Sequence, residues 1–168
     1  MADCVEKQAS IFAVLTGLRF CDVKGLKWQS LKGAQGNYYM QFRQQKTDGA
    51  ETFPLSDEAI QVLKERGDSN DLVFEDLRYS RMKPFLTYWL SDAKIEKNNF
   101  TPHCLRQAYA TIQLNAGTSV YTVKEMLGHK SIQSTMRYLH LLDSTKKETT
   151  SKITMEKTPA VLKVHRNI

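Results

Sequence analysis

The sequence of 168 residues lacks the marks of a membrane-spanning or disulfide-stabilised protein. Its longest apolar runs are a handful of residues, which excludes a transmembrane helix and the apolar core of a secretory signal. Only three cysteines occur, far apart, so a disulfide framework is not expected and a reducing compartment is: Cys4, Cys21 and Cys104. No carboxylate pair and no Cys/His cluster has metal-site spacing, so the sequence predicts no metal and no other cofactor.

What the sequence does have is an excess of positive charge. Lys and Arg number 24 against 18 Asp and Glu, which gives a net charge of +6. Residues 143–168 hold half of this excess, with six basic and three acidic side chains. With 41% hydrophobic and 25% charged residues, the composition is that of a globular chain. A basic excess is compatible with a phosphate-rich partner, but by itself it is weak support for one.

Local patterns predict a mainly helical α+β domain with one small antiparallel sheet. Helices are expected where apolar residues recur at helical spacing between capping residues and glycines, over 5–15, 22–28, 56–66, 84–97, 102–116, 118–127 and 131–142. Residues 37–45 alternate apolar and polar side chains, as a strand does, and residues 51–55 can return as the partner strand. The turn-forming residues between them predict a hairpin. Three large aromatic residues are expected in the core: Trp28, Tyr88 and Trp89.

Polar side chains from distant segments are expected to converge on one site. His103 and Arg106 are three residues apart in the predicted helix 102–116, so they share a face. The chain then folds back as a helical hairpin, which returns His129 towards that face and brings Tyr138 nine residues later. The whole candidate set is Arg19, Lys46, His103, Arg106, His129 and Tyr138.

This set of side chains suits phosphodiester transfer to an oxygen nucleophile. The five-coordinate phosphorus carries extra negative charge on its non-bridging oxygens, which planar arginine forks stabilise. A free phenol has a pKa of about 10, so as a nucleophile it needs nearby positive charge or a proton acceptor such as His103. The departing 5′ oxygen needs a proton donor, a role that Lys46 at the hairpin tip fits, with Arg43 as the nearest competitor.

Three segments resemble the signature boxes of the tyrosine recombinase (phage integrase) family. They are TGLRFCDVKGLKW (16–28), TPHCLRQAYAT (101–111) and LGHKSIQSTMRYLH (127–140). The resemblance spans roughly residues 5–142, in the family's order and spacing, and it implies the α+β fold of DNA breaking and rejoining enzymes. Asp22 departs from the usual Glu, and Gln107-Ala108-Tyr109 replaces the usual His-Thr-Phe, but neither departure changes a catalytic group.

The resemblance implies a role for each candidate residue. The roles are phosphate clamping by Arg19 and Arg106, general acid catalysis by Lys46, general base or acid catalysis by His103, phosphate orientation by His129 and nucleophilic attack by Tyr138. It also implies site-specific recombination of double-stranded DNA through a 3′-phosphotyrosyl intermediate. Because the phosphotyrosine conserves the bond energy, no ATP is expected, and because no carboxylate pair has metal-site spacing, no metal is expected.

The resemblance further implies integration or excision of a mobile element, self-association into a tetrameric synapse on DNA, and a bacterial cytoplasmic setting without a membrane partner. Residues 1–142 are expected to form the catalytic domain, and residues 143–168 a linker and tail. Two alternatives stay open for the tail: docking in cis or in trans, or a disordered basic segment. The family's N-terminal core-binding domain is expected to be missing from this chain. Three rival functions stay open: a type IB topoisomerase, a catalytically idle DNA-binding module and a metal-dependent nuclease.

Overall fold

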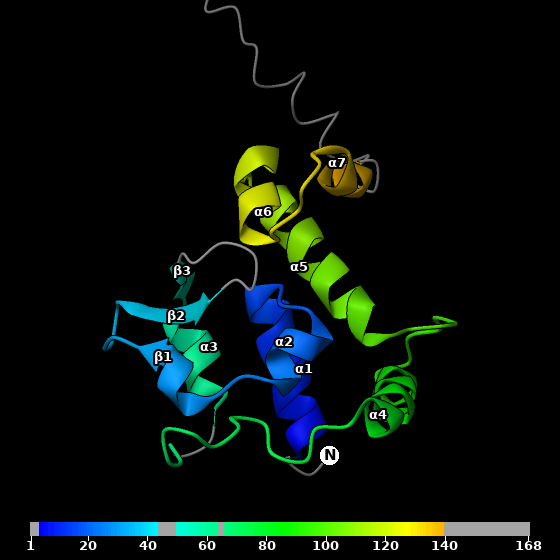
Figure 1. Cartoon of the computed structure of the whole chain (residues 1–168). Coiled ribbons are helices and arrows are strands. Elements are labelled where there is room, and N and C mark those ends of the chain that lie inside the picture. Colours follow the sequence, from blue (N-terminus) through cyan, green and yellow to red (C-terminus); the bar gives the residue numbers. More distant parts are fainter. Residues whose placement is uncertain (1–3, 44–49, 64–65, 140–168) are drawn as a thin grey trace, which may run out of the picture.

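A small sheet lies at one side of the helices in the computed structural model, which describes residues 4–43, 50–63 and 66–139 (Figure 1). In chain order the elements are α1 (Val5–Thr16), α2 (Phe20–Lys24), the 3-10 helix η1 (Trp28–Ser30), β1 (Leu31–Lys32), β2 (Tyr38–Arg43), β3 (Ala50–Leu55), α3 (Asp57–Gln61), α4 (Tyr79–Asp92), α5 (Pro102–Asn115), α6 (Val120–Met126) and α7 (Gln133–Leu139). The predicted α+β class is confirmed. No helix in the described ranges is long and apolar enough to cross a membrane.

The sheet has three antiparallel strands in the order β1-β2-β3. Strands β2 and β3 form the predicted hairpin, with Met40 opposite Phe53, and Met40 points into the core. Because side chains alternate between the two faces of a strand, this register also fixes which side chains of β2 lie on the same face of the sheet as Met40. The turn of the hairpin, with Lys46, lies outside the described residues. Strand β1, only two residues long, was not predicted.

Several helix ends lie where local chemistry places them. Helix α1 stops at Gly17, whose φ of 69° is left-handed and favours glycine. The Ser56 hydroxyl caps α3 by accepting a hydrogen bond from the Ala59 amide at 3.2 Å. Helix α5 begins with Pro102, where the missing amide hydrogen costs nothing. These three ends follow the sequence prediction, although α3 is shorter than expected.

Helix α4 begins at Tyr79, five residues before the predicted start, so Pro84 lies inside it. The predicted helix 84–97 started at Pro84, and proline is common in the first turn of a helix. Inside the helix it removes the amide that would bond the carbonyl of Ser80. Met82 and Leu86 flank it and are almost fully buried, so core packing of this face holds the helix across the proline.

The start of α6 and the extent of α2 also differ from the prediction. Ser119, not Thr118, caps α6, and its hydroxyl accepts from the Thr122 amide at 3.1 Å. Thr118 instead donates its hydroxyl hydrogen to the side chain of Gln113 at 3.0 Å, so it closes the end of α5. Helix α2 starts earlier and ends sooner than predicted, and Trp28 lies in the 3-10 helix η1.

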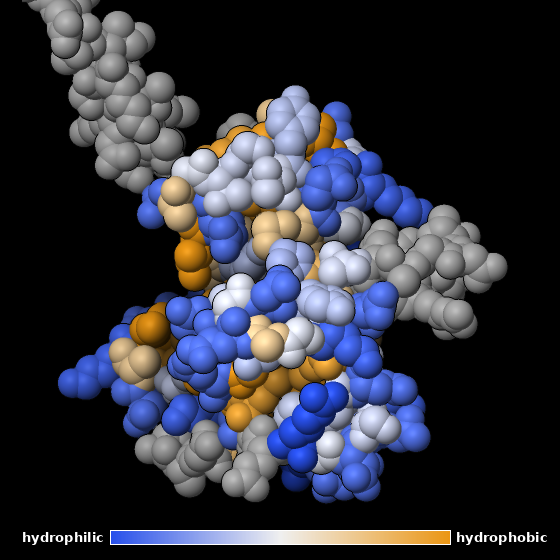
Figure 2. Space-filling model, turned by 90° about the vertical axis from the view of Figure 1, so that its left-hand side faces the viewer, coloured by the Kyte–Doolittle hydropathy of each residue, from blue (hydrophilic) through white to orange (hydrophobic). Residues whose placement is uncertain are grey.

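Two clusters of buried apolar side chains lie along α5. The larger cluster joins α1, the sheet and α4, and receives Leu105 from α5. The smaller one joins α6 and α7 to the later part of α5, including Tyr109. In Figure 1 α5 runs from the part of the molecule near α4 to the part with α6 and α7, and in Figure 2 the surface is indented between these parts. Arg106 therefore lies on the one helix that supplies both clusters.

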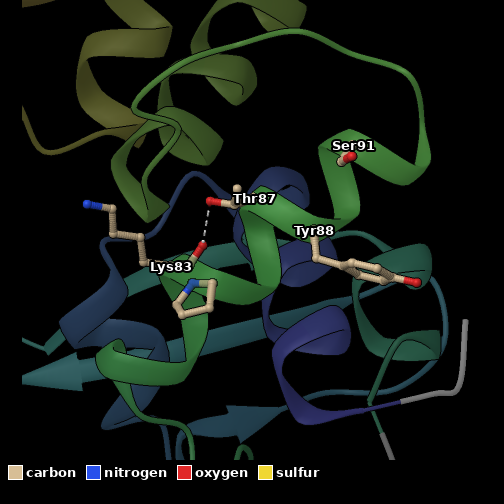
Figure 3. A pocket seen from close by; sticks show the side chains of 5 residues that line it. Lys83, Thr87, Tyr88 and Ser91 are labelled. Carbon is tan, nitrogen blue, oxygen red and sulfur yellow. Dashed lines mark hydrogen bonds between the residues drawn. The ribbon is translucent and has the colours of Figure 1, made fainter.

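Tyr88 is the one aromatic core prediction that is wrong. Trp28 is buried and Trp89 packs against the core, whereas Tyr88 is 62% exposed on α4. It borders a hollow of about 530 Å³ whose lining is Lys83, Pro84, Thr87, Tyr88 and Ser91 (Figure 3). The Thr87 hydroxyl there donates to the Lys83 carbonyl at 3.1 Å. None of the six predicted site residues lines this hollow.

Candidate active site

Arg106 is the buried centre of the candidate site, with only 4% of its surface exposed. One terminal nitrogen of its guanidinium donates to the carbonyl of Gly17 at 2.6 Å, and the other donates to the carbonyl of Leu127. These carbonyls end α1 and α6, so one side chain ties three segments together. No described carboxylate forms an ion pair with it. A guanidinium has five N–H donors, so donors remain for an anionic ligand.

The electrostatics around Arg106 favour an anion. Burial lowers the pKa of the Arg106 guanidinium, and the positive charge of Arg19 lowers it further. Weaker opposing contributions come from Tyr138, Asp22 and Cys21. Two guanidinium groups that repel each other at a partly desolvated place are stabilised when an oxyanion binds between them. A perturbed group of this kind is typical of functional sites.

His129 lies at the turn after α6 and is half-buried. Its Nδ1 atom is 2.8 Å from the hydroxyl oxygen of Thr135 on α7. Burial lowers the pKa of the His129 imidazole, and positive charge lowers it further, from Arg106, Arg19, Arg137 and His103 in that order. A pKa lowered from its ordinary value near 6.5 favours the neutral form of the imidazole at pH 7.

Tyr138 lies on the inner face of α7, 7% exposed, with its ring beside that of His129. The two ring centroids are 6.4 Å apart and the planes differ by 28°, an almost parallel stack. No described residue hydrogen-bonds the Tyr138 hydroxyl. The structure thus brings Arg106, His129 and Tyr138 together, as the spacing of the sequence boxes suggested.

The remaining predicted residues lie at the edge of the candidate site or outside the described ranges. Arg19 precedes α2 and is exposed, and His103 is exposed in the first turn of α5. Both act on the buried groups through charge, Arg19 on Arg106 and His129, and His103 on His129. Lys46 lies outside the described residues, so its role stays a prediction.

A second tyrosine lies near Arg106 but is poorly suited to attack phosphorus. Burial raises the pKa of Tyr109 to about 12, and the charge of Arg106 offsets this only in part. Its hydroxyl donates to the sulfur of Met126 at 3.1 Å, and it belongs to the apolar cluster of α5, α6 and α7. Tyr109 is therefore a packing residue, which leaves Tyr138 as the candidate nucleophile.

Three groups of the site were missed at the sequence level: Thr135 and the carbonyls of Gly17 and Leu127. Thr135 precedes Tyr138 by three residues, and this helical spacing was the only local signal for it. Among the described residues, no group of three or more His, Cys, Asp or Glu side chains is arranged to hold a metal ion.

Comparison with known proteins places this arrangement in a family. Residues 1–145 match the model of the Phage integrase family. The chain belongs to that family. Tyrosine recombinase XerD of Proteus mirabilis is 30% identical over 141 residues, which cover 74% of this chain and 44% of XerD. The chain spans less than half the length of the curated relatives that it matches first.

Solved structures show the same fold. The catalytic domain of bacteriophage HP1 integrase superimposes with a TM-score of 0.61 and 26% identity, over 91% of this chain and 84% of that domain. XerH site-specific recombinase, bound to a palindromic difH substrate in a post-cleavage complex, superimposes with a TM-score of 0.72 at 23% identity. That match covers 87% of this chain and 45% of XerH.

In this member of the phage integrase family, the close contact between Gly17 and Tyr109 can be tested by adding a methyl group. A Cβ at Gly17 would lie 2.5 Å from the Cδ1 atom of Tyr109, and φ is +69°. We expect Gly17→Ala to lower the free energy of unfolding by about 2–5 kcal/mol, from left-handed strain and overpacking. Urea denaturation measures this loss.

Gly36→Ala is the matched control. Gly36 also has a left-handed φ, +80°, but its Cβ would have no heavy atom within 4 Å. The control should lose only the backbone part, about 1–2 kcal/mol. Equal losses in the two variants would show that the Tyr109 contact does not constrain this turn.

Proposed function

We propose that this chain catalyses site-specific DNA strand cleavage and rejoining through a 3′-phosphotyrosyl intermediate on Tyr138. The observation that carries the proposal is the convergence of two guanidinium groups, Arg106 and Arg19, with the stacked pair of His129 and Tyr138. Arginine forks without a carboxylate partner suit a phosphodiester whose charge grows in the transition state.

The proposed reaction proceeds in two transesterifications. The phenol oxygen of Tyr138 attacks the scissile phosphorus and loses its proton to a base, His103. The bond from phosphorus to the 5′ oxygen breaks, and that oxygen takes a proton from a general acid, Lys46. In the second step the 5′ hydroxyl of the partner strand gives its proton to the deprotonated Lys46 and attacks the phosphotyrosyl phosphorus. The bond from phosphorus to Tyr138 breaks, and the phenol oxygen takes back the proton held by His103. Each step replaces one phosphoester bond by another, so no ATP is required. The guanidinium groups of Arg106 and Arg19 supply the charge stabilisation that a metal ion would otherwise give, so the proposed reaction needs no metal ion.

The partner proposed is double-stranded DNA, bound by several copies that assemble as a tetrameric synapse. Support comes from exposed lysines on the segment after Arg19, which suit contacts to the phosphate backbone: Lys24, Lys27 and Lys32. The relative XerH is bound to its difH substrate. We further propose that residues 1–142 form the catalytic domain, that residues 143–168 dock as a tail, and that the protein acts in a bacterial cytoplasm.

The biological purpose proposed is integration or excision of a mobile element. The likeness to the HP1 integrase catalytic domain, over 84% of that domain, supports this purpose. XerD and XerH among the relatives are named recombinases, and they support the chemistry in general.

Trapping of the covalent intermediate tests the proposed chemistry. A pool of duplexes with randomised flanks carries a nick just 3′ of each candidate cleavage position. After attack, the short fragment between the cleavage position and the nick, which bears the new 5′ hydroxyl, diffuses away. We expect an adduct that survives SDS, forms in EDTA without ATP, and yields an enriched sequence on recovery. Its phosphodiester should join the protein to a 3′ end.

Each rival function predicts a different result in the same assay. Strand breaks that EDTA abolishes, without an adduct, would contradict the proposal and indicate a metal-dependent nuclease. Retarded DNA without an adduct would indicate an idle binding module. Adducts on a supercoiled plasmid that relax it, without exchange between two duplexes, would indicate a type IB topoisomerase.

A further inference from the structure

We propose that Thr135 is a positioning residue: its buried hydroxyl donates to Nδ1 of His129, holds the ring as the Nε2–H tautomer and fixes it against Tyr138. The catalytic consequence of this assignment rests on the proposed function, whereas the tautomer itself does not. The inference starts from the contact of 2.8 Å between the Thr135 hydroxyl oxygen and Nδ1 of His129.

The direction of this hydrogen bond follows from burial. Thr135 has none of its surface exposed, and His129 is the only partner of its hydroxyl among the described residues. If Nδ1 carried the proton and donated it, the hydroxyl hydrogen would be buried without an acceptor, which is costly. A helical threonine often donates to the carbonyl four residues earlier, but Thr135 makes no such bond to Ser131. The hydroxyl therefore donates, and Nδ1 accepts.

The protonation state of the His129 ring agrees with a hydrogen bond donated by Thr135. Only a neutral imidazole has a nitrogen free to accept, with its single proton on the other nitrogen. Positive charges that act on His129 from the neighbouring elements disfavour a further positive charge on the ring. They are those of Arg106 on α5, Arg19 before α2 and Arg137 on α7, with the smallest contribution from His103 on α5 when its imidazole is protonated. With Nδ1 accepting, Nε2 carries the hydrogen.

The same contact fixes the helix that bears Tyr138. Thr135 and Tyr138 are three residues apart on α7, so they lie on one face, and both are buried. Met136 and Leu139 on the same helix are exposed, so this buried face is the one turned to the protein. Thr135 holds the edge of the His129 ring while Tyr138 covers its face at a centroid distance of 6.4 Å.

In the proposed reaction the arrangement supplies an N–H donor of fixed direction. No described residue hydrogen-bonds Nε2 of His129, so its hydrogen is available to a non-bridging oxygen of the scissile phosphate. Without the Thr135 hydroxyl, the ring can turn and either nitrogen can carry the proton. Thr135 thus acts on catalysis through His129. In the same way, a residue that hydrogen-bonds a metal-bound histidine acts on the metal through that histidine.

Nitrogen-15 NMR of the free protein tests the tautomer directly. With histidines labelled and the His129 signals identified by their loss in His129→Gln, we expect a protonated Nε2 and a bare Nδ1 at neutral pH. A proton on Nδ1 overturns the assignment. Because this measurement needs no DNA, it decides the tautomer even if the wild-type protein forms no adduct, a result that would contradict only the proposed function.

Two substitutions separate positioning from packing. Thr135→Val keeps the volume and removes the hydroxyl, whereas Thr135→Ser keeps the hydroxyl and removes a buried methyl group. At saturating substrate we expect Thr135→Val to form the adduct about 10–100-fold more slowly with unchanged DNA affinity. Thr135→Ser should stay within about threefold of wild type, because it keeps the hydroxyl and loses only a buried methyl group. Slower adduct formation in Thr135→Ser than in Thr135→Val overturns the positioning role, as does wild-type activity in Thr135→Val. Urea denaturation of both variants shows that each is folded under the assay conditions.

Discussion

Replacement of Tyr138 by phenylalanine is expected to abolish the covalent DNA adduct while the protein stays folded. The variant removes only the oxygen that would join phosphorus, and Tyr109, the other tyrosine near Arg106, is poorly suited to take its place. By analogy with removal of a catalytic nucleophile in a serine protease, the rate of strand cleavage should fall by about 10⁴-fold or more. The assay is the nicked-duplex trap in EDTA, read on an SDS gel.

The fold should tolerate this change because the ring makes the contacts. Tyr138 is 7% exposed and stacks on His129 through its face, and no described residue hydrogen-bonds its hydroxyl. The free energy of unfolding should therefore change by less than about 1 kcal/mol. DNA affinity in a gel-shift assay should also be close to that of the wild type, so that a lost adduct reports lost chemistry.

Tyr109→Phe is the control that matches burial and proximity to Arg106. Its hydroxyl bonds the sulfur of Met126, a weak acceptor, so its loss should affect stability slightly and leave adduct formation within a few-fold of wild type. Tyr121→Phe, at an exposed position on α6, should change neither quantity. An adduct that persists in Tyr138→Phe and disappears in Tyr109→Phe would show that Tyr109, and not Tyr138, is the nucleophile.

The helices that could be predicted from the sequence are those bounded by local signals. Helix α5 starts at the Thr101-Pro102 pair and ends before Gly117, and these signals act over one turn of chain. The start of α4 could not be predicted in this way. Its stability across Pro84 depends on burial of Met82 and Leu86 against residues distant in sequence, and no local pattern reports that burial.

The candidate site also contains residues that a sequence pattern predicts and groups that no sequence pattern predicts. His103 and Arg106 share a helix, so their spacing alone places them on one face, and the order of the three boxes predicted that His129 and Tyr138 join them. The groups that hold Arg106 could not be predicted, because they are backbone carbonyls of Gly17 and Leu127. Every residue has a carbonyl, so its role has no signature in residue type. Lys46 stays a prediction.

Replacement of Arg106 by lysine is expected to impair both cleavage and folding, and this double effect follows from its two kinds of partner. Lysine keeps the positive charge, but its three donors are on one nitrogen atom, whereas different terminal nitrogens of the guanidinium bind the two carbonyls. By analogy with the arginine that stabilises charge in nucleotide hydrolysis, adduct formation should slow by about 10³–10⁵-fold. Loss of charge-assisted bonds to Gly17 and Leu127 should lower the free energy of unfolding by about 2–4 kcal/mol.

Arg19→Lys separates the two effects. Arg19 is exposed before α2, and its side chain makes no described capping bond, so its replacement should change stability by less than about 0.5 kcal/mol. Its guanidinium acts on the same site through charge, and loss of its fork should still slow adduct formation by at least tenfold. Rates are compared at a temperature at which circular dichroism shows both variants folded.

If Arg106→Lys slowed cleavage by less than tenfold while it lowered stability, the buried guanidinium would serve only to join α1, α5 and α6. The phosphate would then have to be bound by exposed groups alone, in a more polar setting where each charge contributes less. A large rate loss in both variants, with a stability loss in Arg106→Lys alone, is what a shared phosphate clamp requires. One arm of that clamp would be built into the fold, and the other would be free to meet the DNA.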